Sequence, residues 1–95
     1  MSVGKELVAS NGTTTVVFRF IGRSMFIQGS MTGNAQQVIQ QMKAKNALKA
    51  VTQSGNWVKI DLIDDISEQD LHETVFNNMV KAYEAAKFTI KTKEI

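Results

Sequence analysis

The residues best suited to chemistry in this chain are carboxylates gathered in one short segment. Asp61, Asp64, Asp65 and Glu68 lie close together in the sequence. Hard cations such as Mg²⁺ take oxygen ligands, so a metal-dependent enzyme with its site in this segment is one hypothesis. The spacing does not match an EF-hand loop, however, and acidic residues before and after Ser67 also stabilise the N-terminus of a helix that begins there. We therefore expect helix stabilisation and no metal, and rank the enzyme third.

Other nucleophilic or phosphate-binding patterns are incomplete. The chain has no cysteine, so disulfides and thiolate metal sites are excluded, and its single histidine, His72, does not by itself indicate a catalytic triad. The segment 29–34, with a glycine at each end of its first five residues, can begin a helix and cradle a phosphate on its amides. It lacks the Lys-Ser/Thr ending of a P-loop. We predict a non-enzymatic protein that needs no cofactor.

Charge is divided unevenly along the chain. The net charge is +2, but no acidic residue lies between Glu6 and Asp61. The basic residues within that stretch are Arg19, Arg23, Lys43, Lys45, Lys49 and Lys59. The acidic residues then follow without a base among them: Asp61, Asp64, Asp65, Glu68, Asp70 and Glu73. Such a division can steer a polyanion toward one face, or allow acidic and basic surfaces of two copies to meet.

Composition indicates a small globular domain. A length of 95 residues, 43% hydrophobic and 21% charged, suits one domain over residues 1–95. The first residues, Met1–Glu6, contain no apolar run typical of a signal peptide, and the longest uncharged stretch, 24–42, is too polar to span a membrane. With no cysteine, we expect a cytoplasmic protein without membrane contact.

Two turn signals organise the first part of the chain. Asn11-Gly12 predicts a type I′ hairpin turn, with Leu7 opposite Val16, and Gly22-Arg23 predicts a second tight turn, with Phe20 opposite Met25. Because strand side chains alternate between faces, these two registers place the apolar residues on one face. That expected core face carries Val3, Leu7, Val16, Phe18, Phe20, Met25 and Ile27.

The remaining elements complete an α+β chain. Helical spacing from Asn34 predicts a helix to about Lys45, which residues 47–51 extend or follow with a further turn, and residues 52–56 predict a loop. Alternation over 57–63 predicts a strand, a helix follows from Ser67, and residues 88–93 predict a last strand. The order βββαβαβ is typical of a two-layer sandwich, a mixed five-stranded sheet with two helices on one face.

The sheet face away from the helices is the main candidate site. By alternation it carries more apolar and aromatic residues than a solvated face requires, and such patches usually mark contact sites. We predict that it binds a protein partner or a second copy in a homo-oligomer. The candidate contact residues are Val17, Arg19, Ile21, Phe26, Trp57 and Lys59. A cover formed by the C-terminal segment or a loop is the simplest competing interpretation.

Single-stranded nucleic acid is the alternative partner for the same face. Bases would stack on Phe26 and Trp57 while basic side chains contact phosphates. Lys43 and Lys45 on the polar face of the first helix, and Lys49 after that helix, would also contact phosphates. The full candidate set is Arg19, Phe26, Lys43, Lys45, Lys49, Trp57, Lys59, Lys91 and Lys93. No RNP-type aromatic motif accompanies them.

Overall fold

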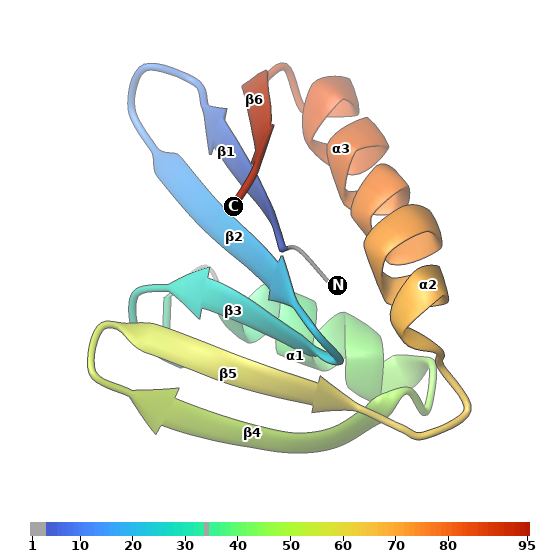
Figure 1. Cartoon of the computed structure of the whole chain (residues 1–95). Helices are drawn as coiled ribbons and strands as arrows, with labels where there is room; N and C mark the ends of the chain where they lie inside the picture. Colours follow the sequence, from blue (N-terminus) through green and yellow to red (C-terminus); the bar gives the residue numbers. More distant parts are fainter. Residues whose placement is uncertain (1–3, 34) are drawn as a thin grey trace.

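Six antiparallel strands form a single sheet, and the helices pack on one side of it (Figure 1). The computed structural model describes residues 4–33 and 35–95. The strands are β1 (Lys5–Ser10), β2 (Thr15–Ile21), β3 (Ser24–Gln28), β4 (Leu48–Ser54), β5 (Trp57–Leu62) and β6 (Thr89–Glu94). Their order in the sheet is β4-β5-β3-β2-β1-β6, so the chain's last strand pairs with its first.

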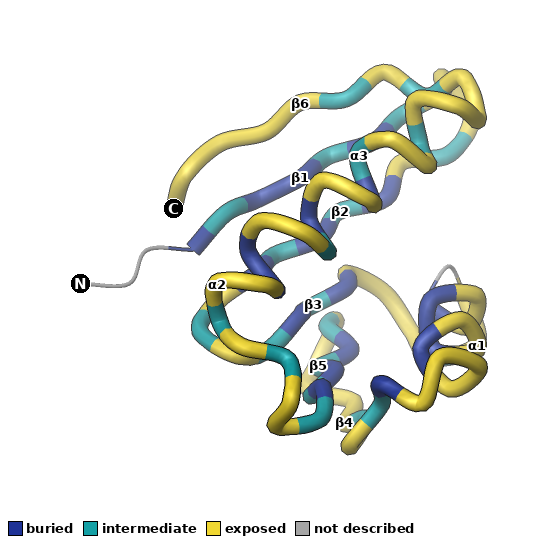
Figure 2. Tube along the Cα trace, turned by 90° about the vertical axis from the view of Figure 1, so that its right-hand side faces the viewer, coloured by how far each residue is buried: buried dark blue, intermediate teal, exposed yellow. Residues whose placement is uncertain are grey.

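Two helical segments cover the sheet. The first is α1 (Ala35–Ala44); the second runs without a break through α2 (Glu68–Asp70), the π-helical turn η1 (Leu71–Val75) and α3 (Phe76–Ala85). Figure 2 shows α1 beside the β4–β5 half of the sheet and α3 beside the half that contains β1 and β2. Among the described residues, no helix is long and apolar enough to cross a membrane.

The predicted fold class is confirmed in its α+β, helix-on-sheet form, but the predicted mixed five-stranded sheet is wrong. The sheet has six strands and is antiparallel throughout, because β4 occupies residues expected to extend the first helix and to form a loop. The helix ends in a Schellman motif: Asn46 has a φ of 55°, and the Ala47 amide donates to the Met42 carbonyl at 2.9 Å. The chain then forms a hairpin around Gly55-Asn56, a two-residue turn signal that the sequence contained.

The register of the first three strands is partly as expected. The second turn pairs Phe20 with Met25, as predicted. The first pairs Leu7 with Phe18 instead of Val16, because the turn has four residues rather than two. The Asn11 side-chain oxygen accepts hydrogen bonds from the amides of residues 13 and 14 at 3.0 and 2.8 Å, which favours the longer turn. A shift of two residues leaves every side chain on its predicted face.

One hydrophobic core lies between the sheet and the helices. The predicted core face is confirmed over the described residues: its side chains from β1, β2 and β3 are buried, and Val3 lies outside the described residues. Leu71, Phe76 and Met79 close the core from the second helix. The core residues of α1 are Ala35, Val38, Ile39 and Met42. All these residues belong to one cluster, so both helices cover the same sheet face.

The π-helical turn is tied to the sheet by two polar contacts. The Lys5 Nζ donates to the His72 carbonyl at 2.9 Å and lies 5.1 Å from the centre of the Phe76 ring. The His72 ring nitrogen Nε2 lies 2.8 Å from the Gly22 carbonyl. These contacts hold the start of the second helix against β1 and the β2–β3 turn, so His72 has a structural role.

Replacing Ile60 by alanine tests the core position of β5. Ile60 is 0% exposed and lies between Met25 of β3 and Val51 of β4. We expect Ile60→Ala to lower the free energy of unfolding by about 2–5 kcal/mol, measured by urea denaturation. Thr52→Val, an exposed change on the same hairpin, is the control and should stay within about 0.5 kcal/mol of the wild type. Equal effects of the two changes would contradict the burial of Ile60 in the core.

Candidate functional site

All six predicted contact residues lie on the sheet face opposite the helices, which we call the open face. Arg19 pairs with Phe26, and Phe26 pairs with Lys59, so these three form a row across β2, β3 and β5. By strand alternation, Val17 and Ile21 lie on the same side of β2 as Arg19, and Trp57 lies on the same side of β5 as Lys59. The structure therefore brings the predicted set together on one surface.

Arg19 connects the two halves of this face. Its Nε donates to the Glu6 Oε2 at 2.9 Å, and its guanidinium carbon lies 4.6 Å from the centre of the Trp57 ring. The guanidinium of this β2 residue therefore contacts a side chain of the adjacent β1 and a side chain of β5, which lies beyond β3. It combines a charge-assisted hydrogen bond with a cation–π contact.

Glu6 is a buried carboxylate on this face. Its residue is only 8% exposed, and its Oε1 also lies 3.5 Å from the Lys93 Nζ. The hydrogen bond from Arg19 lowers the pKa of Glu6, with Lys93 adding to the effect, although burial alone would raise it. Glu6 is therefore stabilised in its charged form, and the stabilisation depends on the same Arg19 that covers Trp57.

The centre of the open face is electrically balanced. Its four ionisable side chains are two carboxylates and two cations: Glu6, Arg19, Lys59 and Asp61. The Ser24 hydroxyl donates to the Asp61 Oδ1 at 2.6 Å, which satisfies the second carboxylate. The excess positive charge lies at the outer strand β6, on Lys91 and Lys93. The centre can therefore approach another neutral surface without net repulsion.

The open face is less exposed than the sequence suggested. Val17, Phe26 and Trp57 are half-buried, and the Arg19 guanidinium lies over the Trp57 ring. Among the residues that the structure describes, the exposed large apolar side chains are those of Ile21, at 45%, and Ile95, at 42%. The expected apolar surface is therefore concentrated at one end of the face.

Ile21 and Ile95 form what we call the isoleucine ridge. Both side chains flank Gly4: the Cγ1 atom of each lies 3.0 Å from the position that a Cβ atom would take there. The backbones of Gly4 and Ile95 are hydrogen-bonded in both directions, at 3.2 and 2.9 Å. Ile95 lies beyond the last strand predicted from the sequence, which ends at residue 93, and the pairing that places it beside Ile21 depends on the strand order.

A shallow depression, which we call the hollow, lies beside the ridge. It has a volume of about 200 Å³ and is lined by Arg19, Ile21, Phe26, Ser54 and Trp57. Four of these five residues belong to the predicted contact set, and Ser54 comes from the strand that the sequence did not reveal. The hollow therefore offers an apolar floor with a guanidinium at its side.

The residues proposed for nucleic acid are not all brought together. Lys43 lies on α1, in the layer on the other side of the sheet, and Lys45 follows that helix. The Lys49 Nζ lies 3.2 Å from the Asp64 Oδ1. The remaining members of the set lie on the open face: Arg19, Phe26, Trp57, Lys59, Lys91 and Lys93.

The acidic segment is divided among local partners. Asp64 contacts Lys49 and lies 3.7 Å from the Arg23 guanidinium, while the Ser67 hydroxyl accepts the Asp70 amide at 3.0 Å and caps the helix. Within residues 4–33 and 35–95, no three His, Asp or Glu side chains are placed to hold a metal ion. The Ser67–Asp70 contact fits the expected stabilisation of the helix N-terminus.

Acid titration tests the burial of Glu6. The pKa of Glu6 is lowered in the folded state from its usual value of 4.5. Glu6 therefore stabilises the fold at pH values above 4.5, and this stabilisation is lost as the pH falls through the folded-state pKa. We expect Glu6→Gln to be less stable than the wild type at pH 7 and to lose less stability below pH 4.5. Urea midpoints measured from neutral to acid pH give both profiles.

The control for this titration is Glu84→Gln. Glu84 is exposed on α3, and none of its described neighbours forms an ion pair with it, so the profile should follow the wild type. If Glu6→Gln and the wild type lost stability in parallel, the buried ion pair would have no energetic role.

Comparison with known proteins adds no relative on which to base the function. No protein-family model, no curated protein and no solved structure matches this chain.

Proposed function

We propose that this protein acts by contact rather than by catalysis, and that its open face binds a second copy of the chain. The observation that carries this proposal is the position of the isoleucine ridge directly beside the hollow, on one surface. In a two-fold dimer the same patch is used by both copies. Ile21 of each copy would then enter the hollow of the other, against Phe26 and Trp57.

The composition of the face supports this arrangement. Aromatic residues and arginine are enriched at protein interfaces, and Phe26, Trp57 and Arg19 lie at its centre. On the neighbouring β4, the residues of the same face are small and uncharged: Ala50, Thr52 and Ser54. Small side chains allow two sheets to approach closely, since packed sheets lie only about 10 Å apart.

The charge distribution also favours a second copy. The balanced centre contains the Glu6–Arg19 pair together with Lys59 and Asp61, so two copies can meet without opposing like charges there. Lys91 and Lys93 lie on the outer strand β6, at the rim of such an interface. A charged rim around a less charged centre is the usual anatomy of a protein contact.

The size of the face sets the expected affinity. Four strands about 4.8 Å apart and about five residues long, at 3.4 Å each, cover an area of roughly 19 by 17 Å. Standard interfaces bury about 800 Å² of accessible surface on each partner, so this contact belongs to the small end of the range. We expect a dissociation constant in the micromolar range.

Nucleic acid fits the same face less well. Base stacking requires an accessible aromatic ring, whereas the Trp57 ring is covered on one side by the Arg19 guanidinium. Phosphate binding requires an excess of positive charge, whereas the centre is balanced. A protein partner other than a second copy remains compatible with the face and is distinguished by the following experiment.

Sedimentation velocity from about 10 to 500 μM protein tests the proposal, since micromolar contacts dissociate within this range. We expect the wild type to form a dimer and Ile21→Glu to remain a monomer, because two carboxylates would have to enter apolar hollows whose one lining cation, Arg19, already pairs with Glu6. Gln40→Glu adds the same charge to an exposed position of α1, in the other layer, and should dimerise like the wild type.

Circular dichroism and melting temperatures establish that each variant is folded. A wild type that stays monomeric over the whole range would overturn self-association. A dimer that Ile21→Glu leaves intact would show that the copies meet through a different surface.

A further inference from the structure

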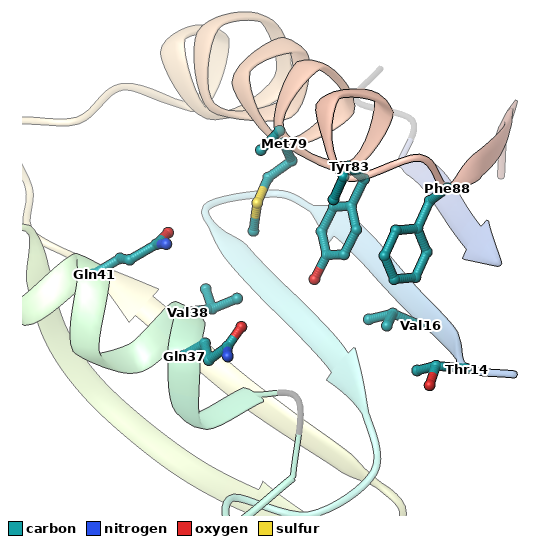
Figure 3. Close-up of a pocket in the computed structure, with 10 residues that line it drawn as sticks. Thr14, Val16, Gln37, Val38, Gln41, Met79, Tyr83 and Phe88 are labelled. Atoms are coloured by element: carbon teal, nitrogen blue, oxygen red, sulfur yellow. The ribbon is translucent and has the colours of Figure 1, made fainter. Parts of the chain in front are cut away.

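A cleft lies on the helix side of the sheet, between α1 and α3 (Figure 3). It has a volume of about 250 Å³. Its floor and walls include Val16 of β2, Val38 of α1, Met79 and Tyr83 of α3, and Phe88. The cleft is separated from the open face by the thickness of the sheet, so its use is independent of the proposed function.

The cleft exists because two helices are narrower than the six-stranded sheet on which they pack. Six strands about 4.8 Å apart span roughly 24 Å, whereas two helices of about 10 Å diameter cover roughly 20 Å. The twist of the sheet turns the two helices away from each other, because each follows a different set of strands. Figure 2 shows α1 and α3 attached to opposite halves of the sheet, with a separation between them.

Aromatic rings form a fixed wall on one side of the cleft. The second helix ends in a Schellman motif, in which Lys87 has a φ of 70° and the Phe88 amide donates to the Tyr83 carbonyl at 3.0 Å. The apolar contact that accompanies this motif brings the Tyr83 and Phe88 rings together, with centres 5.1 Å apart and planes at 85°. On the core side, the centre of the Phe18 ring lies 5.6 Å from the centre of the Tyr83 ring.

The polar groups at the cleft are all neutral. They are the amides of Gln37 and Gln41, the hydroxyl of Thr14 and the phenol of Tyr83. Figure 3 shows the Gln37 amide and the Tyr83 hydroxyl directed toward the same space. Among the described residues, no side-chain hydrogen bond occupies these groups, and no charged residue lines the cleft. A bound molecule can therefore find both donors and acceptors there without meeting a charge.

We propose that this cleft binds a small, uncharged aromatic molecule that carries one hydrogen-bonding group, such as an aromatic amide or a phenol. The apolar walls would hold the ring, while Gln37, Gln41 or Tyr83 would pair with the polar group. The size agrees with this class: a cavity of about 150 Å³ holds benzene, and larger ligands occupy pockets from about 300 Å³ upward. The volume of about 250 Å³ suits one or two rings.

The probes for the test are 1-naphthamide and 1-naphthoate, which have similar shapes but differ in charge. Each is titrated into isotope-labelled protein, and NMR shifts are followed at the Met79 methyl group and the Gln37 and Gln41 amides. We expect saturable shifts with the amide and at least tenfold weaker binding of the anion, because the cleft offers no cation. Equal affinity for both probes, or no saturable shift at millimolar amide, would overturn the proposal.

Two leucine substitutions on α3 locate the binding site. Ala82 lines the cleft, so Ala82→Leu should fill it and weaken 1-naphthamide binding at least tenfold. Ala85 is exposed on the same helix and does not line the cleft, so Ala85→Leu should bind like the wild type. Ala86→Leu, which also faces the cleft, replaces Ala82→Leu if that variant fails to fold. If the variant with leucine in the cleft bound 1-naphthamide as tightly as the wild type, the binding site would lie elsewhere and the proposal would be overturned.

The only tyrosine of the chain provides a second measurement. Burial raises the pKa of the Tyr83 phenol in the free protein. Because a bound ring would remove more water from the phenol, ultraviolet titration should show a further rise in the pKa of Tyr83 with saturating 1-naphthamide. Ala82→Leu should show no such rise on addition of the amide. An unchanged titration curve in the wild type would exclude binding at this cleft.

Discussion

Two helices must cover six strands, and this constraint shapes the whole molecule. A sheet can be buried on one face by a single helical layer, and here that layer parts between α1 and α3 over the start of β2. The helices consequently leave a cleft between them, and no second layer covers the opposite face in residues 4–33 and 35–95. Both candidate sites are therefore consequences of the same shortage of covering structure.

On the open face, one side chain both shields an aromatic ring from water and neutralises a buried charge. Arg19 covers part of the Trp57 ring and at the same time neutralises the buried carboxylate of Glu6, whose other cation, Lys93, lies farther away at 3.5 Å. The same contact balances the charge at the centre of the face. These contacts leave the isoleucine ridge and the hollow available for a complementary surface.

Strand β2 carries both sites on its two sides. Side chains alternate along a strand, so Val16 contributes to the cleft while Arg19 and Ile21 line the hollow. Phe18, on the cleft side, packs against Tyr83 within the core. The strand lies near the middle of the sheet, between β1 and β3, and its rigid pairing on both sides holds the two sites in a constant relation.

The edges of the sheet are treated differently. The outer strand β6 presents Lys91 and Lys93, and lysines on an edge strand discourage further pairing. The other edge, β4, has a bulge between Leu48 and Ala50 and then small uncharged residues on the open face. This second edge extends the flat part of the face beside the hollow, which suits it to contact with another sheet.

Local rules in the sequence determined which side chains share a face, the second turn, and the apolar stripes of the helices. These depend on alternation, turn chemistry and helical spacing, each of which acts over a few neighbouring residues. Tertiary structure alone decided the strand order, and with it the meeting of Arg19 with Trp57, whose strands are separated by another strand. It also decided that Ile95 lies beside Ile21 and that α1 and α3 are separated by a cleft. Such contacts and separations between distant segments depend on how the whole core packs.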